Sequence, residues 1–123
     1  MVVLRCLIID DNAAFLDASS SLLERQGLSV VGRASNGADG VRLAAELTPD
    51  LILLDIDLGA ESGFTVARQL AATNGAGARN VIFISTHPED DFTELVEQSP
   101  TAGFIPKSEL SLKAIEFFAF PLG

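Results

Sequence analysis

The amino-acid sequence predicts an α/β fold: a doubly wound parallel β-sheet of five strands with five helices. Short apolar runs alternate along the chain with segments whose apolar residues recur at helical spacing. Several runs, such as CLII, LILL and VIFI, contain no polar residue, which is typical of strands covered on both faces. Because five β-then-α units fit into 123 residues, right-handed crossovers are expected between parallel strands.

The predicted strands are the five apolar runs, each followed by a turn or by a helical pattern. They are Val2–Ile9, Ser29–Ala34, Leu51–Leu54, Val81–Ile84 and Ala102–Ile105.

The first two helices have recognisable ends. The first is expected to end at Gly27, because glycine tolerates the left-handed conformation that commonly terminates helices. Asn36 can cap the second by accepting a hydrogen bond from a backbone amide. The residues expected on the buried sides are Phe15, Ala18 and Leu22 in the first helix, and Val41, Ala44 and Ala45 in the second.

Three more helices are predicted after the third, fourth and fifth strands. Ser62 or Gly63 begins the third helix, a weaker helical pattern follows Pro88, and Pro121 ends the fifth helix. The residues expected on their buried sides are Val66, Ala67 and Leu70; Phe92, Leu95 and Val96; and Leu112, Ala114, Ile115 and Phe118.

Length and composition indicate a single globular domain, which we place at residues 1–123. A hydrophobic content of 48% suffices for one core at this length. No apolar segment approaches the length of a membrane span, and the N-terminus lacks a signal-peptide pattern. Cys6, the single cysteine, cannot form an internal disulfide. We therefore expect a cytoplasmic protein without membrane association.

The net charge of −9 argues against direct binding of nucleic acid by this domain, because eight basic residues cannot offset seventeen acidic ones against a phosphate backbone. A divalent cation is a better partner for such a chain. Solubility alone accounts for every carboxylate that is not singled out below.

Polar and charged residues follow four of the five predicted strands. Asp10 and Asp11 follow the first, Asp55 the third, Ser85 and Thr86 the fourth, and Lys107 the fifth. The carboxyl ends of parallel strands meet at one edge of a sheet, where sites form in this architecture. Carboxylates about 5 Å apart repel by roughly 3 kcal/mol per pair at an effective dielectric constant near 20, so three ionised acids need a cation. Mg²⁺ prefers such oxygen ligands, and the amine and hydroxyls suit phosphoryl transfer.

The motifs resemble the receiver domain of response regulators in two-component signalling, over essentially the whole chain. They are DD at positions 10 and 11, LLDIDLGAESG around Asp55, FIST ending in Ser85 and Thr86, and GFIPKS around Lys107. The resemblance implies a flavodoxin-like sheet with strand order 2-1-3-4-5, as in chemotaxis receivers.

The resemblance also implies a role for each of these residues. Asp55 would accept a phosphoryl group from a sensor histidine kinase or a phosphotransfer protein, in a signalling domain that catalyses only its own phosphorylation and dephosphorylation. Asp10 and Asp11 would hold Mg²⁺, or Mn²⁺ in its place, with the Asp55 carboxylate and the backbone carbonyl of Asp57. Lys107 would pair with Asp55 and then with the phosphoryl group.

Two further positions match the family's conformational switch. Ser85 aligns with the switch hydroxyl, although Thr86 offers a second hydroxyl at the same strand end. Phe104 aligns with the aromatic switch position, which would reshape the face of the fourth helix, fifth strand and fifth helix for partner binding or dimerisation. Asp57 and His87 lie two positions beyond Asp55 and Ser85, where we expect them to tune dephosphorylation.

The sequence departs from the family pattern at three places, one of which is Phe104, which has no hydroxyl and can act only by packing. Gly59 stands where many receivers have proline, which is expected to loosen the loop after the third strand. Pro106 precedes Lys107 instead of following it, so the cis bond common after that lysine is not predicted.

Each assignment has a simpler alternative. Asp10, Asp11 or Asn12 could serve only as a helix cap, Lys107 could be a solvated lysine, and Ser85 with Thr86 could merely begin a turn. His87 has no second histidine with which to share a metal.

Two other functions remain open. A degenerate receiver would serve only as a docking module. ILLDIDLG also resembles the Asp-x-Asp motif of haloacid-dehalogenase-type phosphatases, but that motif normally lies on the first strand of a longer chain.

The C-terminal segment AIEFFAFPLG bears on how the domain acts. Phe117, Phe118 and Phe120 cannot all face the sheet from one helix. At least one is therefore expected to contact a partner or a second copy, with core burial as the alternative for Phe117 or Phe118.

Overall fold

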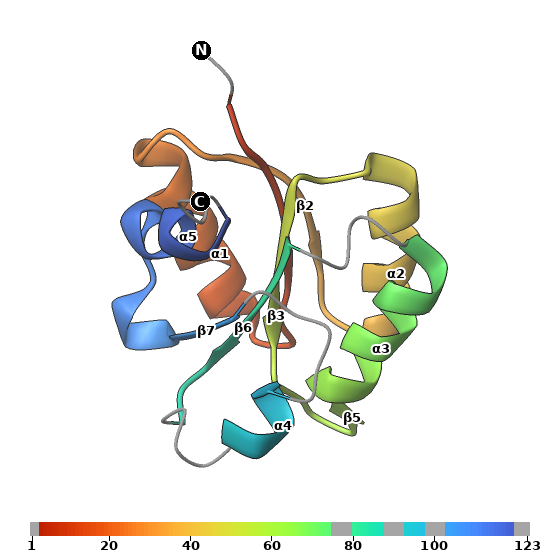
Figure 1. Ribbon diagram of the computed structural model, residues 1–123. Helices are drawn as coiled ribbons and strands as arrows, with labels where there is room; N and C mark the ends of the chain where they lie inside the picture. The colour runs from red at the N-terminus through yellow and green to blue at the C-terminus, as the bar shows by residue number, and fades with distance from the viewer. Residues whose placement is uncertain (1–2, 75–79, 88–92, 98–102, 120–123) are drawn as a thin grey trace.

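Five parallel strands form the central sheet of the protein. The computed structural model describes residues 3–74, 80–87, 93–97 and 103–119. Over these residues the strand order is β2-β1-β3-β6-β7 (Figure 1). The strands are β1 (Arg5–Ile9), β2 (Ser29–Ala34), β3 (Leu51–Asp55), β6 (Val81–Ser85) and β7 (Gly103–Pro106). Counted along the chain this is the order 2-1-3-4-5, so the predicted fold class is confirmed.

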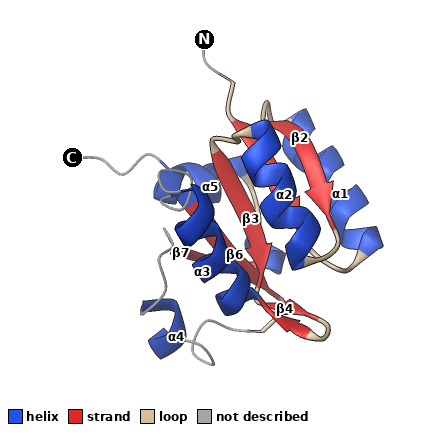
Figure 2. Ribbon diagram, turned by 90° about the vertical axis from the view of Figure 1, so that its right-hand side faces the viewer, coloured by secondary structure: helices blue, strands red, loops and turns tan. Residues whose placement is uncertain are grey.

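Helices cover both faces of the sheet (Figures 1 and 2). One face carries α1 (Ala13–Arg25) and α5 (Leu112–Ala119), and the other carries α2 (Gly37–Leu47) and α3 (Gly63–Asn74). The short α4 (Thr93–Glu97) adds Val96 to the apolar cluster on the α2–α3 side.

Alternation along the strands divides the core into two apolar clusters. In β1, Leu7 and Ile9 pack on the α2–α3 side, whereas Cys6 and Ile8 pack on the α1–α5 side. Every residue of β3 and β6 is buried. This double burial explains why these strands appear in the sequence as continuous apolar runs.

The buried side of α1 differs from the prediction. Its buried residues are Leu16, Ser19, Ser20 and Leu23. Ala18 is exposed, and Phe15 and Leu22 are only half-buried. The Ser19 hydroxyl donates to the Phe15 carbonyl at 2.6 Å, which satisfies a polar group that faces the core. The predicted apolar stripe of α1 was therefore wrong by about one position.

In the other helices, every predicted residue whose side chain is described is buried or half-buried except one, and the side chain of Leu95 is not among those described. The Asn36 side chain accepts a hydrogen bond from the Asp39 amide at 2.8 Å and caps α2. Gly63 begins α3, as predicted. Ala45 was expected to be buried on α2 but is exposed. Pro88, Phe92, Phe120 and Pro121 lie outside the described residues.

A small hairpin that the sequence did not predict follows β3. Its strands are β4 (Asp57–Leu58) and β5 (Glu61–Ser62), and they pair antiparallel (Figure 2). Gly59 at the turn has a φ of 72°, which glycine adopts without strain. The expectation of a loose loop at Gly59 was therefore wrong, because the glycine permits a tight turn.

Gly63 allows α3 to start directly against the end of β3. A Cβ atom at this position would collide with the backbone carbonyl oxygen of Asp55 and lie 2.7 Å from the Ile56 Cα. The Gly63 amide also donates to the Ile56 carbonyl at 2.7 Å. The backbone that carries Asp55 is therefore fixed by a contact that only glycine permits.

We expect Gly63→Ala to lower the free energy of unfolding by about 1–3 kcal/mol, because the added methyl group meets backbone that cannot rotate away. Chemical denaturation measures this change. Thr65→Ala, at an exposed site in the same helical turn, serves as the control and should stay within about 0.5 kcal/mol of wild type. A Gly63→Ala protein as stable as this control would contradict the prediction.

Candidate functional site

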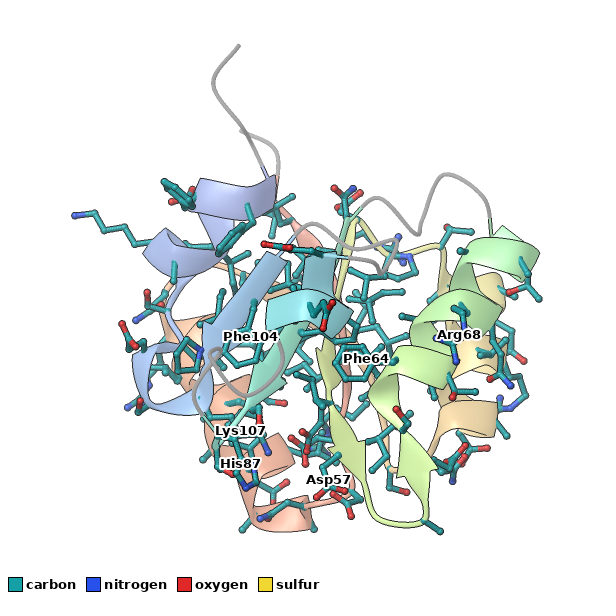
Figure 3. The ribbon with its side chains drawn as sticks, turned by 60° about the horizontal axis from the view of Figure 1, so that its bottom comes forward. Asp57, Phe64, Arg68, His87, Phe104 and Lys107 are labelled. Atoms are coloured by element: carbon teal, nitrogen blue, oxygen red, sulfur yellow. The ribbon has the colours of Figure 1, made fainter. Side chains whose placement is uncertain are left out.

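The polar residues predicted at the strand ends lie together at the carboxyl edge of the sheet. Asp10 follows β1, Asp55 and Ser85 end β3 and β6, and Lys107 follows β7. Asp10 is 0%, Asp55 5% and Ser85 1% exposed, so these polar groups are embedded in the sheet edge. Figure 3 shows Lys107, His87 and Asp57 at this end of the molecule.

Three of these side chains are oriented by the same local hydrogen bond. Asp10 Oδ1 accepts from the Asn12 amide at 2.9 Å, and Asp55 Oδ1 accepts from the Asp57 amide at 3.1 Å. Ser85 Oγ accepts from the His87 amide at 3.0 Å. In each case the residue at the strand end bonds to the amide two positions later. The turn after each strand thus fixes one oxygen and leaves the second oxygen of each carboxylate for other contacts.

Lys107 joins the two buried carboxylates. Its Nζ atom lies 2.6 Å from Asp10 Oδ2 and 3.2 Å from Asp55 Oδ2. Only 11% of the Lys107 side chain is exposed. Lys107 is therefore not a solvated lysine, and one ammonium group serves two carboxylates.

Burial and charge together shift the ionisation of Asp55 and Lys107. Burial raises the pKa of Asp55 to about 6, and the charge of Asp10 acts in the same direction, whereas the Asp57 amide and Lys107 oppose the shift. Burial would lower the pKa of Lys107, but the hydrogen bonds and charges of Asp10 and Asp55 raise it overall. The site therefore combines a carboxyl group that resists ionisation with an ammonium group that keeps its proton.

Three carboxylates form a group that could hold a metal ion. One oxygen each from Asp10, Asp11 and Asp55 lie within 4.8 Å of one another. Asp11 is exposed, so it can bring solvent-accessible oxygen to the group. Apart from the ion pair with Lys107, Asp10 Oδ2 has no hydrogen-bond partner in the described part of the chain. With one lysine against three acids, the site retains an excess of negative charge that suits Mg²⁺.

The hairpin lies against the exposed edge of this group. A Cβ atom added at Gly59 would lie 3.3 Å from Asp11 Oδ2. Asp57 is exposed in β4, and its Oδ1 accepts from the Gly59 amide at 3.2 Å. The hairpin therefore holds Asp57 beside the acids, although sequence inspection suggested only a loose loop here.

The remaining predicted site residues occupy two environments. Thr86 and His87 are exposed after β6. Phe104 is buried in β7, where it pairs in register with Phe83 and belongs to the cluster on the α2–α3 side (Figure 3). The alternative that Asp10 or Asp11 caps the first helix is excluded, because the side chain of Asn12 caps α1.

Phe15 is a site residue that sequence inspection missed. Lys107 Nζ lies 4.2 Å from the centroid of the Phe15 ring. The sequence suggested only that Phe15 packs in the core. Its position four residues after Asp11, in the first turn of the following helix, was the available signal.

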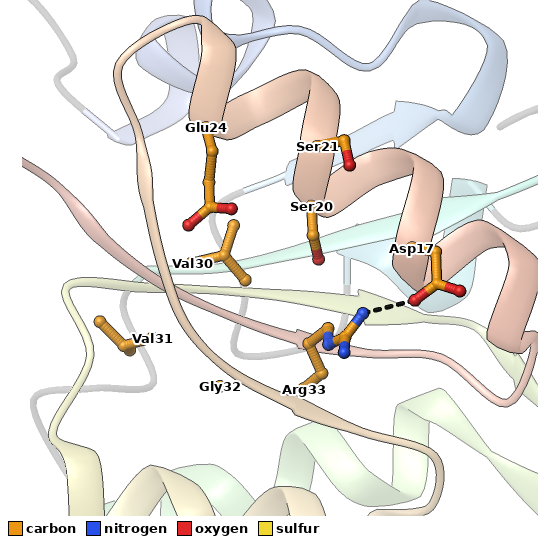
Figure 4. Close-up of a pocket in the computed structure, with 8 residues that line it drawn as sticks. All are labelled: Asp17, Ser20, Ser21, Glu24, Val30, Val31, Gly32 and Arg33. Carbon is orange, nitrogen blue, oxygen red and sulfur yellow. Dashed lines mark hydrogen bonds and ion pairs between the residues drawn. The ribbon is translucent and has the colours of Figure 1, made fainter.

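A surface groove between α1 and β2 is separate from the acidic group. It has a volume of about 500 Å³ (Figure 4). Across it, Arg33 of β2 forms an ion pair with Asp17 of α1 at 2.7 Å. The groove is lined by residues of α1 and β2, and none of the acids at the carboxyl edge of the sheet contributes to it.

Comparisons with known proteins agree with the fold. The family model of the response regulator receiver domain matches residues 6–115. The chain is 34% identical over 105 residues to the transcription regulator BvgA of Bordetella pertussis, covering 85% of this chain and 49% of BvgA. It is 36% identical over 86 residues to PilH of Pseudomonas aeruginosa, covering 70% of each chain.

A solved structure of a receiver domain also matches this chain. The receiver domain of NarL from Mycobacterium tuberculosis matches with a TM-score of 0.84 and 27% identity, covering 99% of this chain and 100% of that chain. The protein therefore belongs to the response regulator receiver domain family, a family of signalling domains. The chain spans about half the length of BvgA. Within the described residues, no helix is long and apolar enough to cross a membrane.

The raised pKa of Asp55 predicts a specific pH dependence of stability. In Mg²⁺-free buffer, the Asp55 carboxyl should titrate near pH 6, as followed by carbon-13 NMR. Because this pKa lies above the value of 3.8 for an ordinary aspartate, the folded state binds the proton more tightly. The contribution of Asp55 to stability is therefore full below pH 3.8 and is lost as the pH rises through about 6.

Comparison with Asp55→Asn isolates this contribution. The difference in unfolding free energy, wild type minus variant, should fall between about pH 4 and pH 6 and then stay constant. A constant difference across this range, or a carboxyl titration near pH 4, would contradict the assignment.

Proposed function

We propose that this domain accepts a phosphoryl group on Asp55 from a sensor histidine kinase or a phosphotransfer protein. The observation that carries the proposal is the position of Lys107 Nζ, which contacts the carboxylates of both Asp10 and Asp55 at the carboxyl edge of the sheet. An acceptor carboxylate, a neighbouring cation and a second acid that faces the same point are the groups that phosphoryl transfer requires.

The donor set fits Mg²⁺, with Mn²⁺ as an alternative. Asp10, Asp11 and Asp55 would hold the ion, with the backbone carbonyl of Asp57 as a further ligand. When bound, Mg²⁺ supplies positive charge that neutralises the phosphoryl oxygens and the acids together. The carboxylate oxygens within 4.8 Å of one another, and the buried Asp10 Oδ2, support this assignment.

The residues of the chain divide the remaining tasks. An Asp55 carboxylate oxygen attacks phosphorus, and the bond between phosphorus and the donor nitrogen breaks with its electron pair on the leaving imidazole. The Asp57 amide holds Asp55 Oδ1 in place during this step. Lys107 stabilises the charge on the transferring group, because its ammonium already lies at the acceptor.

Phosphorylation would act through Ser85 and Phe104. The Ser85 hydroxyl would leave its hydrogen bond with the His87 amide and point towards the phosphoryl group. Thr86 offers the second candidate hydroxyl. Phe104 has no hydroxyl, so it can respond only by packing. It lines a groove of about 390 Å³ between β7 and α5, which supports a route from the acceptor to the outer face.

The face formed by α4, β7 and α5 is the proposed contact surface for a partner or a second copy. Phe117 on α5 borders the groove and is 76% exposed. Phe118 is half-buried against Gly103 and touches Phe117 edge-on, with ring centroids 5.1 Å apart. This arrangement fits the expectation that one of the clustered phenylalanines contacts a partner. A partner protein is favoured over direct nucleic-acid binding by the net charge of −9.

The two alternatives make different predictions. A degenerate docking module would not need Lys107 at Asp55, and the acids, hydroxyl and lysine are all present at the sheet edge. A phosphatase of the haloacid-dehalogenase type would turn over p-nitrophenyl phosphate repeatedly. The first acid of its Asp-x-Asp pair would here be Asp55, which ends β3, the third strand along the chain.

The direct test is Mg²⁺-dependent phosphorylation by acetyl phosphate, with mass spectrometry to locate the adduct. We expect one phosphoryl group on Asp55, and we expect Asp55→Asn to abolish it while circular dichroism shows an intact fold. No adduct on wild type would favour the docking module, repeated turnover would favour the phosphatase, and label at another residue of wild type would refute Asp55 as acceptor.

Asp57 and His87 are expected to set the lifetime of the aspartyl phosphate. Both follow the site residues by two positions and are exposed beside the acceptor, where their polar groups can hold a water molecule near phosphorus. We expect Asp57→Ala and His87→Ala each to slow the decay of phosphorylated protein by about threefold, or about 0.7 kcal/mol in the barrier.

The decay is measured by the loss of the adduct after removal of acetyl phosphate. Ser21→Ala, at an exposed position on α1, is a control that should leave the rate unchanged. Wild-type decay rates in both variants would exclude the tuning role.

A further inference from the structure

The ammonium of Lys107 has a third neighbour besides the two carboxylates. Its Nζ atom lies 4.2 Å from the centroid of the Phe15 ring. This distance is within the range of about 6 Å in which the negative face of an aromatic ring attracts a cation. The ring therefore covers the ammonium while Asp10 and Asp55 accept its charge at 2.6 Å and 3.2 Å.

The segment that carries the acids also fixes this ring. Phe15 lies in the first turn of α1, and its amide donates to the capping oxygen Asn12 Oδ1 at 3.0 Å. The Asn12 amide in turn donates to Asp10 Oδ1 at 2.9 Å. One short segment thus positions both a carboxylate and an aromatic ring against Lys107, which follows the edge strand β7.

A ring suits this position because it is neutral. A third carboxylate beside Lys107 would draw the ammonium away from Asp55 and repel an incoming phosphoryl group. The ring attracts the ammonium weakly and excludes water, so the remaining hydrogen-bonding capacity of the ammonium stays with the carboxylates and the transferring group.

We infer that Phe15 is a positioning residue that holds the Lys107 ammonium at the acceptor carboxylate through its ring face. The effect on phosphoryl transfer rests on the proposed function, whereas the contact itself does not. Phe15 does not touch the reacting atoms, and it acts only through Lys107. Simple packing on the α1–α5 side is the competing role for a half-buried phenylalanine, so the experiment must separate ring electronics from ring size.

The first measurement is NMR of the metal-free, unphosphorylated protein. Protons above a ring face are shifted upfield, so the Lys107 ε-methylene protons should resonate upfield of those of Lys113, an exposed lysine on α5. Phe15→Leu should remove the shift, and Phe15→Tyr should keep it. Ordinary lysine shifts in the wild type would overturn the inference, whatever the phosphorylation result.

The second measurement is the rate of phosphorylation by acetyl phosphate. Phe15→Leu should slow it by about two- to fivefold, and Phe15→Tyr should restore it. Phenylalanine with one, two or three ring fluorines at position 15 keeps nearly the same shape but weakens the negative ring face stepwise. The rate should fall stepwise along this series.

The outcomes distinguish the positioning role of Phe15 from simple packing and from a failure of the proposed function. A rate that is equal across the fluorinated series, or unchanged in Phe15→Leu, would overturn the positioning role. A series in which only Phe15→Leu is slow would assign Phe15 to packing and also overturn it. A wild-type protein without any adduct would refute the proposed function, and with it the kinetic role, while the chemical shifts would still decide the contact.

Discussion

The structure of the site depends on the burial of two carboxylates beside one ammonium. Asp10 and Asp55 are almost fully buried at the ends of adjacent strands, and Lys107 contacts both. One positive charge cannot neutralise two buried negative charges, and Asp11 adds a third at the surface. Burial is the main cause of the raised pKa of Asp55, and the charge of Asp10 adds to it. The side chains of the site therefore carry an excess of negative charge, which a divalent cation or a protonated carboxyl would relieve.

The turns after the strands make this arrangement possible. At the ends of β1, β3 and β6, a side-chain oxygen accepts from the amide two residues later. These short-range bonds need no partner elsewhere in the fold, so each side chain is oriented by its own turn. The second oxygen of each carboxylate, Oδ2 of Asp10 and of Asp55, then faces Lys107. The local turn fixes the direction of each carboxylate, and the parallel sheet brings the two carboxylates together.

The sequence was sufficient where one strong pattern decided the structure. Buried parallel strands such as β3 and β6 contain only apolar residues before their last position, and the polar residues at that position, Asp55 and Ser85, marked the site. The pattern failed where a local hydrogen bond allowed a polar residue to be buried. The Ser19 hydroxyl bonds to a carbonyl of its own helix, so Ser19 is buried, whereas the apolar Ala18 is exposed. The pattern also failed for the β4–β5 hairpin, because strands of two residues have no periodicity. The contact between the Phe15 ring and Lys107 could not be predicted, because it depends on side-chain directions that residue spacing does not specify.

The strand order explains why the cation must be carried on a long side chain. Lys107 follows β7, whereas Asp55 ends β3 and Asp10 follows β1, and both of these strands lie beyond β6 in the sheet. Neighbouring strands are about 4.8 Å apart, so the end of β1 lies about 14 Å from β7. An aspartate or serine at position 107 could not span this gap. The intervening strand β6 ends in Ser85, a small side chain that is 1% exposed. The length of the lysine side chain therefore lets an ammonium group from the edge strand reach both carboxylates, whose own side chains cover part of the distance.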